Sequence, residues 1–230
     1  MLATIKSLII MVQFVITVLI TIVLMYIFKN HTYAIRQGWA KMQTFLINFR
    51  IIQKGKIDKR AKIILVNHQS LLDITSLEAI YPKDLCWVAK KEIRDIPLFG
   101  YILEAPKMIV IDRKDRRSLV KMFKQAKERI DEGRVIAIFP EGTRGRGKKL
   151  LKFQSGAKFL AQKLDLLVQP VVVANTKYIL DSQNFKAHSG EVIVKYLDLV
   201  DPKSDENWYE NIRKNMQNTL DELNHEISNK

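Results

Sequence analysis

An uncharged apolar run near the start of the chain constrains its fold more than any other feature. Residues 8–28 read LIIMVQFVITVLITIVLMYIF and contain no charged side chain. At ~1.5 Å of rise per residue, a helix of about 21 residues measures ~32 Å, enough to cross the hydrocarbon core of a bilayer. The run is too long for the apolar region of a signal peptide, and no small-residue cleavage pattern follows it. We therefore expect an apolar membrane helix at about 8–28 that stays in the protein.

Basic residues lie unequally on the two sides of this run. Lys6 is the only one before it, and those that follow it are Lys29, Arg36, Lys41, Arg50 and Lys54. The positive-inside rule then predicts a protein of the inner (cytoplasmic) membrane whose downstream domain faces the cytoplasm. Cys86 is the only cysteine, so no intrachain disulfide can form, in agreement with that side of the membrane.

A second N-terminal segment, residues 34–49, mixes aromatic and aliphatic positions with a few bases. This pattern predicts an amphipathic helix at about 34–50, and it is typical both of a helix at the membrane interface and of one packed on a soluble domain. We therefore divide the chain into membrane-anchoring helices, residues 1–54, and a second unit, residues 55–230.

The second unit alternates short β-branched runs with segments of helical spacing. The predicted strands are 62–67, 85–90, 107–112, 134–139, 166–174 and 191–197. The predicted helices are 71–80, 117–132, 156–164 and a C-terminal amphipathic helix at about 205–228. Strands that alternate with helices indicate an α/β class, with one domain built on a mixed, largely parallel sheet flanked by helices.

The net charge of +14 indicates an anionic partner, which charge alone leaves open among nucleic acid, phosphorylated substrates and acidic lipid surfaces. The chain contains no recognised nucleic-acid-binding motif or stacking platform, so we expect no nucleic acid partner. Four histidines and one cysteine are too few and too scattered for a zinc site, and we expect no metal.

The stretch VNHQSLLD, residues 66–73, admits two interpretations. Ser70, followed three residues later by Asp73, is typical of a capping box that opens a helix. Asp73 can also hold Nδ1–H of His68 across the turn, which leaves Nε2 to take a proton from a substrate hydroxyl. The residues alone leave both interpretations open.

Residues 135–157 run from a buried strand into a loop rich in glycine and arginine. Glycines let backbone N–H groups approach an anion, and the guanidinium of Arg144 matches phosphate oxygens two at a time. The bases that follow, Arg146, Lys148, Lys149 and Lys152, fit either this site or a solvated or lipid-facing patch. A nucleotide-binding P-loop is excluded because Lys149 stands where a Ser or Thr is required.

Four blocks together carry a family resemblance. They are Asn67-His68 with Asp73, Ile111-Asp112-Arg113, Phe139-Pro140-Glu141-Gly142-Thr143-Arg144, and the apolar strand around Pro170. Over roughly residues 60–175 the chain resembles the 1-acylglycerol-3-phosphate acyltransferase family of glycerolipid acyltransferases. Without that resemblance, Arg113 beside Asp112 would be read as a surface ion pair at a strand end.

The resemblance implies transfer of a fatty acyl group from acyl-CoA or acyl-carrier protein to the sn-2 hydroxyl of lysophosphatidic acid, giving phosphatidic acid at an anionic membrane. It implies His68 as the general base and Asp73 as its orienter. The implied substrate-binding residues are Arg113, Glu141, Gly142, Thr143 and Arg144. No cofactor is expected beyond the acyl donor, and no acyl-enzyme, because a thioester is already activated. The alternatives are an acyltransferase acting on glycerol 3-phosphate or another lysophospholipid, and a lipid hydrolase.

Overall fold

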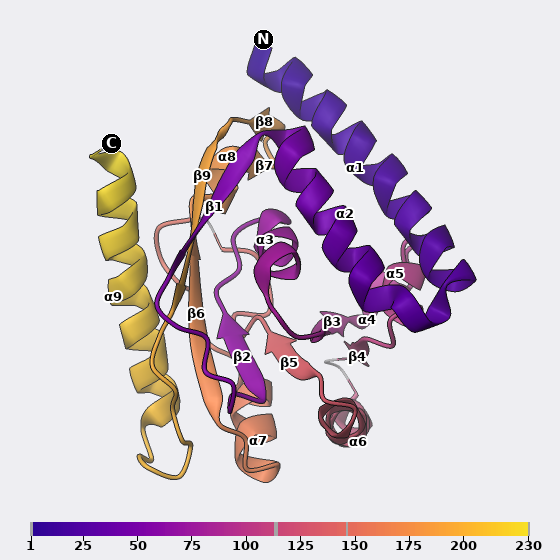
Figure 1. The fold of residues 1–230 in the computed structure, drawn as a ribbon. Helices are drawn as coiled ribbons and strands as arrows, with labels where there is room; N and C mark the ends of the chain where they lie inside the picture. Colours follow the sequence, from indigo (N-terminus) through magenta and orange to yellow (C-terminus); the bar gives the residue numbers. More distant parts are fainter. Residues whose placement is uncertain (1, 113–114, 146, 230) are drawn as a thin grey trace.

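A seven-stranded sheet forms the centre of the computed structural model, which describes residues 2–112, 115–145 and 147–229 (Figure 1). The strand order is β1-β9-β6-β2-β5-β3-β4. Its strands are β1 (Phe49–Lys54), β2 (Ile63–Val66), β3 (Leu85–Lys90), β4 (Ile109–Ile111), β5 (Val135–Ile138), β6 (Val168–Ala174) and β9 (Gly190–Tyr196). β6 and β9 pair antiparallel, and the other neighbours pair parallel. The predicted α/β class with a mixed, largely parallel sheet is confirmed.

The three central strands β2, β5 and β6 are buried at every residue. Parallel strands covered on both faces have this pattern, which explains their continuous aliphatic sequences. The helices of the domain are α3 (Leu72–Ile80), α4 (Lys91–Arg94), α5 (Tyr101–Glu104), α6 (Arg116–Asp131), α7 (Ser155–Lys163), α8 (Thr176–Ile179) and α9 (Trp208–Ser228). α9 covers β6 on one side of the sheet, and α3 lies on the other (Figure 1). A small hairpin, β7 (Leu180–Asp181) and β8 (Lys186–Ala187), follows α8.

The two N-terminal helices, α1 (Leu2–Ile27) and α2 (Thr32–Ile47), pack side by side and are joined by the short helix η1 (Lys29–His31) (Figure 1). α1 is long and apolar enough to cross a membrane, by length and composition. Its inner face packs Val18, Ile22 and Met25 against α2 and the segment that contains α5. Its outer face is apolar too, and Ile9 is 63% exposed there. α2 in turn packs on α3, so the helical pair rests on the sheet's domain.

β1 was not predicted from the sequence. The predicted helix extends to about residue 50 and the predicted sheet domain begins at residue 55, whereas α2 ends at Ile47 and the sheet begins at Phe49. Asn48 ends the helix in the left-handed conformation, with φ of 63°, and its N–H bonds back to the carbonyls of Phe45 and Thr44. β1 then pairs along its whole length with β9. A six-residue edge strand directly after a helix carries too little periodicity to be separated from it.

Candidate active site

The ends of parallel strands bring the predicted site together. β2 runs into Asn67 and His68, β5 into Phe139, and β6 into Asn175 and Thr176. Because these strands are neighbours and point the same way, their following loops meet at one edge of the sheet, where α/β proteins commonly bind ligands. The amide of Asn67 fastens the first loop to β6, donating to the carbonyl of Val173 at 2.9 Å and accepting from its N–H at 2.7 Å.

The structure places His68 and Asp73 in contact. Nδ1 of His68 lies 2.9 Å from Oδ2 of Asp73, whose side chain is fully buried in the first turn of α3. The same Oδ2 accepts the N–H groups of Gln69 at 2.6 Å and Ser70 at 2.9 Å. The other oxygen, Oδ1, accepts the hydroxyl of Thr176 at 2.5 Å. Four donors therefore hold this carboxylate in one orientation.

The two interpretations of residues 66–73 describe the same carboxylate. Asp73 reaches back to the N–H of Ser70, as the acidic partner in a capping box does, while it also holds His68. Ser70 departs from the motif: its hydroxyl donates to the carbonyl of Leu180 at 2.6 Å and accepts from the N–H of Leu72 at 3.3 Å. The helix cap and the imidazole contact are thus one arrangement.

The imidazole of His68 is packed on one face and partly open to solvent. Its ring stacks on that of Phe139, with centroids 3.8 Å apart and planes 14° apart, and its side chain is 15% exposed. When Nδ1–H of a neutral histidine donates a hydrogen bond to a carboxylate, Nε2 keeps a lone pair and can accept a proton. The arrangement therefore suits general-base chemistry at Nε2.

The loop after β5 is tied to the backbone of His68. Oε1 of Glu141 accepts the N–H of His68 at 2.8 Å, and Oε2 accepts the N–H of Leu151 at 2.7 Å. The N–H of Gly145 donates to the carbonyl of His68 at 2.7 Å. A Cβ at residue 145 would lie 3.3 Å from Oε2 of Glu141, so a larger residue there would require this carboxylate to shift. Burial raises the pKa of Glu141, opposed by the hydrogen bonds from Leu151 and His68.

The other predicted substrate-binding residues are arranged less firmly. Nη1 of Arg144, which is half-buried, donates to the hydroxyl of Ser182 at 3.0 Å, and Thr143 is exposed. Gly142 has φ of 70°, in the region that favours glycine, and its N–H donates to the carbonyl of Phe139. Arg113, predicted to bind phosphate, lies outside the described residues, as does Arg146. Lys148, Lys149 and Lys152 are exposed.

Thr176 belongs to the site but was not predicted from the sequence. It follows β6 at the same edge of the sheet as His68, so the available signal was a polar residue directly after a buried parallel strand. The N–H groups of Gly142, Gln69 and Ser70 donate hydrogen bonds within the protein.

The fold and the site define an α/β protein with a histidine–aspartate pair at the carboxyl edge of a largely parallel sheet. Residues 48–174, more than half of the chain, match the Acyltransferase family. The chain belongs to the acyltransferase family, which confirms the resemblance predicted from its motifs, and it is an enzyme of that family.

Two relatives and one solved structure show how far the similarity extends. The 1-acyl-sn-glycerol-3-phosphate acyltransferase of Helicobacter pylori (strain J99) is 42% identical over 176 residues, 76% of this chain and 74% of that protein. The enzyme of the same name from Saccharomyces cerevisiae is 30% identical over 188 residues, 77% of this chain and 61% of that protein. The fold is shared with the crystal structure of the 1-acyl-sn-glycerophosphate (LPA) acyltransferase PlsC from Thermotoga maritima, with a TM-score of 0.74. The two chains are 23% identical in sequence, and the superposition covers 97% of this chain and 95% of the T. maritima chain.

Proposed function

We propose that this enzyme transfers a fatty acyl group from an acyl thioester to the sn-2 hydroxyl of 1-acyl-sn-glycerol 3-phosphate and produces phosphatidic acid. The relatives from H. pylori and S. cerevisiae, which carry the name of this activity, support the choice of acceptor. The observation that carries the proposal is the contact between His68 and the buried, fourfold hydrogen-bonded carboxylate of Asp73.

In the proposed mechanism, Nε2 of His68 removes the proton from the acceptor hydroxyl as that oxygen attacks the thioester carbonyl. The tetrahedral intermediate then expels the thiolate, which takes the proton back from the imidazolium and leaves as a thiol. The acyl group passes directly between the two substrates, since a thioester needs no further activation by an enzyme nucleophile.

Asp73 has two roles in this scheme. Its contact with Nδ1 selects the tautomer whose Nε2 accepts a proton, and its charge stabilises the imidazolium that forms during attack. Because Thr176 and the N–H groups of Gln69 and Ser70 also hold the carboxylate, it has little freedom to turn away. The site is therefore organised before substrate binds, which reduces the reorganisation required in the transition state.

The acceptor phosphate is assigned to the loop after β5 and to Arg113. Arg144 lies three residues after Glu141, and the carboxylate of Glu141 accepts a hydrogen bond from the backbone N–H of His68. A phosphate bound by Arg144 would therefore hold the acceptor near the proposed base. A guanidinium binds two phosphate oxygens at once. Gly142 and Thr143 lie in the same loop and are proposed to contact the phosphate beside Arg144. Glu141 acts here through the backbone, since both of its oxygens accept N–H groups of the protein.

In this proposal the N-terminal helices hold the enzyme at a membrane. The acceptor and the product are lipids, whereas acyl-CoA or acyl-carrier protein arrives from water, so we propose that the catalytic domain faces the cytoplasm at the inner membrane. The apolar outer face of α1 supplies the contact with lipid, and the net charge of +14 attracts an anionic surface.

The test is an acyl-transfer assay in membranes that contain the full chain, with a labelled acyl thioester and 1-acyl-sn-glycerol 3-phosphate. We expect the label in phosphatidic acid. Label released as free fatty acid would instead show a hydrolase. Competition with glycerol 3-phosphate and with lysolipids that lack a phosphate monoester checks the acceptor: preference for either would refute the assignment.

A further inference from the structure

Three rings from three neighbouring strands stack at the edge of the sheet. His68 follows β2, Phe139 follows β5 and Trp87 lies in β3, and these strands are adjacent in the order β2-β5-β3. The centroids of His68 and Phe139 are 3.8 Å apart, those of Phe139 and Trp87 are 5.0 Å apart, and the planes differ by 14° and 21°. In the register of β3 and β5, Trp87 stands opposite Ala137, two residues before Phe139, so the rings of Trp87 and Phe139 meet diagonally on one face of the sheet, within the reach of aromatic side chains. We call these three residues the aromatic ladder.

The ladder supplies a constraint that Asp73 does not. A hydrogen bond at Nδ1 fixes one edge of the imidazole but leaves the ring free to tilt about that contact. Face-to-face packing on Phe139 sets the plane of the ring, and the Trp87 indole, 5% exposed, prevents Phe139 from moving away. Together the carboxylate and the ladder determine both the position and the direction of Nε2.

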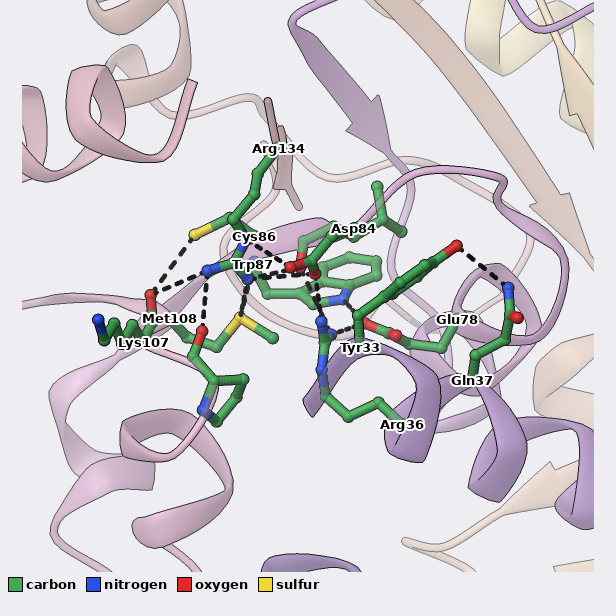
Figure 2. Close-up of polar contacts among 12 residues, drawn as sticks. Tyr33, Arg36, Gln37, Glu78, Asp84, Cys86, Trp87, Lys107, Met108 and Arg134 are labelled. Carbon is green, nitrogen blue, oxygen red and sulfur yellow. Dashed lines mark hydrogen bonds and ion pairs between the residues drawn. The ribbon is translucent and has the colours of Figure 1, made fainter. Parts of the chain in front are cut away.

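Trp87 is itself held by buried charges (Figure 2). Its indole N–H donates to Oε1 of Glu78 at 2.8 Å, and Glu78, 4% exposed, forms an ion pair with Arg36 of α2. Arg36 also pairs with Asp84, and Nε of Arg134 lies 3.0 Å from Oδ2 of Asp84. Two guanidinium groups thus balance two carboxylates.

This balance makes burial of Arg36, Glu78 and Arg134 tolerable, with Asp84 only partly buried, but it does not make the charges a source of stability. Apolar side chains of similar volume often stabilise a core as well as a buried ion pair, or better. The group instead fixes geometry, because it sets where the indole of Trp87 can lie. It also joins α2, one of the two N-terminal helices, to the support of the active-site ring.

We propose that Phe139, Trp87 and Glu78 are positioning residues for His68, and that Arg36 makes α2 part of this support. The inference deepens the proposed function, on which it rests. In this proposal the N-terminal helical pair does more than hold the enzyme at the membrane. The contact of Arg36 with Glu78 also helps to keep the imidazole of His68 in position.

Trp87→Leu tests the ladder. A misplaced base loses rate while substrate binding persists, so we expect kcat to fall by about tenfold or more with KM changed by less than about twofold. Trp87→Phe, which retains a ring to stack on Phe139, should recover most of the rate. The matched control is Trp208→Leu, which removes an equally buried indole from α9, away from the site. Unchanged kcat in Trp87→Leu, or an equal loss in Trp208→Leu, would overturn the proposal.

A second readout is independent of acyl transfer. The chain has four histidines, so NMR of the detergent-solubilised full chain with labelled histidine can resolve each ring, with His68 assigned from the His68→Ala spectrum. Stacking on Phe139 should shift the ring protons of His68 upfield. We expect that shift to shrink in Phe139→Leu and Trp87→Leu and to persist in Trp208→Leu. A shift that stays in all three variants would disprove the ladder, whichever acceptor the enzyme uses.

Arg36→Met tests the contribution of α2. We expect lower kcat and a smaller His68 shift, while the chain still sediments with membranes, because the outer face of α1 is unchanged. Glu78→Gln, which keeps an oxygen to accept the indole N–H, should have the milder effect. Normal kcat together with a normal His68 shift in Arg36→Met would remove α2 from the proposal. If the wild-type enzyme makes no phosphatidic acid, the proposed function fails, whereas the NMR comparison still decides the positioning claim.

Discussion

The loop after β2 and the loop after β5 meet at the same edge of the sheet but hold their functional side chains very differently. After β2, the carboxylate of Asp73 is fully buried and accepts four hydrogen bonds, one of them from Nδ1 of His68. After β5, Thr143 is exposed, and Arg144 is half-buried with one guanidinium nitrogen on Ser182. The backbone of the second loop is nevertheless fastened to His68 through Glu141 and Gly145.

This difference matches the roles proposed above, in which His68 acts in the reaction and Arg144 in binding of the acceptor. A general base must be oriented before its substrate arrives, because misorientation raises the barrier directly. A long side chain that binds phosphate can become ordered when the ligand arrives, at the expense of part of its rotamer entropy. The first loop should therefore control kcat and the second should control KM for the acceptor.

His68→Ala is the strongest test of this division. Removing the proposed base should lower kcat by about 10² to 10⁴, with the fold intact by circular dichroism. His188→Ala is the matched control, since that ring also stacks on an aromatic side chain, Tyr178, and has no contact with Asp73 among those described. Near-normal turnover in His68→Ala would remove the mechanism.

Arg144→Ala should act on binding. Hydrogen bonds to charged groups contribute ~1.5–3 kcal/mol, so we expect KM for 1-acyl-sn-glycerol 3-phosphate to rise about tenfold to a hundredfold with a smaller change in kcat. Ser182→Ala removes the observed partner of Arg144 but keeps the guanidinium, and its KM should stay close to that of the wild type. An unchanged KM in Arg144→Ala contradicts the phosphate role.

Thr176→Val tests whether the hydrogen bond from Thr176 to Oδ1 of Asp73 helps to orient this carboxylate. The substitution keeps the shape and removes the hydroxyl donor to Oδ1, while the donors to Oδ2 remain. At ~1 kcal/mol for one hydrogen bond, kcat should fall about fivefold. Thr75→Val, in the same buried region but bonded to the carbonyl of Leu71, provides the control. Equal effects in the two variants would indicate a packing defect and not a role in orienting Asp73.

Glu141→Gln should lower the stability of the fold by an amount that depends on pH, because the amide NH2 replaces an oxygen that accepts a backbone N–H. The folded-state pKa of Glu141 is raised by burial, so its contribution to stability is present below the unfolded value of about 4.3 and is lost as pH rises through the folded pKa. Glutamine does not titrate. The free energy of unfolding of the variant, relative to wild type, should therefore improve from pH 4 to pH 8, as measured by chemical denaturation. A difference that is constant over this range would show that the carboxyl is not penalised by burial.

Much of the fold was predictable from local patterns. The strands at 85–90 and 191–197 and the helix at 71–80 agree with β3, β9 and α3 to within one residue at each end. The contact of His68 with Asp73 was also predictable, because the two lie in one turn at the start of a helix. β1 was missed because it is a short edge strand whose partner, β9, lies near the other end of the chain.

The sequence by itself determined the apolar N-terminal helix, the alternation of strands and helices, and the residues that carry the family motifs. Each of these depends on neighbours a few positions apart. Only the tertiary structure decided that Thr176 holds Asp73, that Phe139 and Trp87 stack beside His68, and that Arg36 pairs with Glu78. These contacts follow from the order of strands in the sheet and from the packing of α2 on α3, which residues distant along the chain establish together.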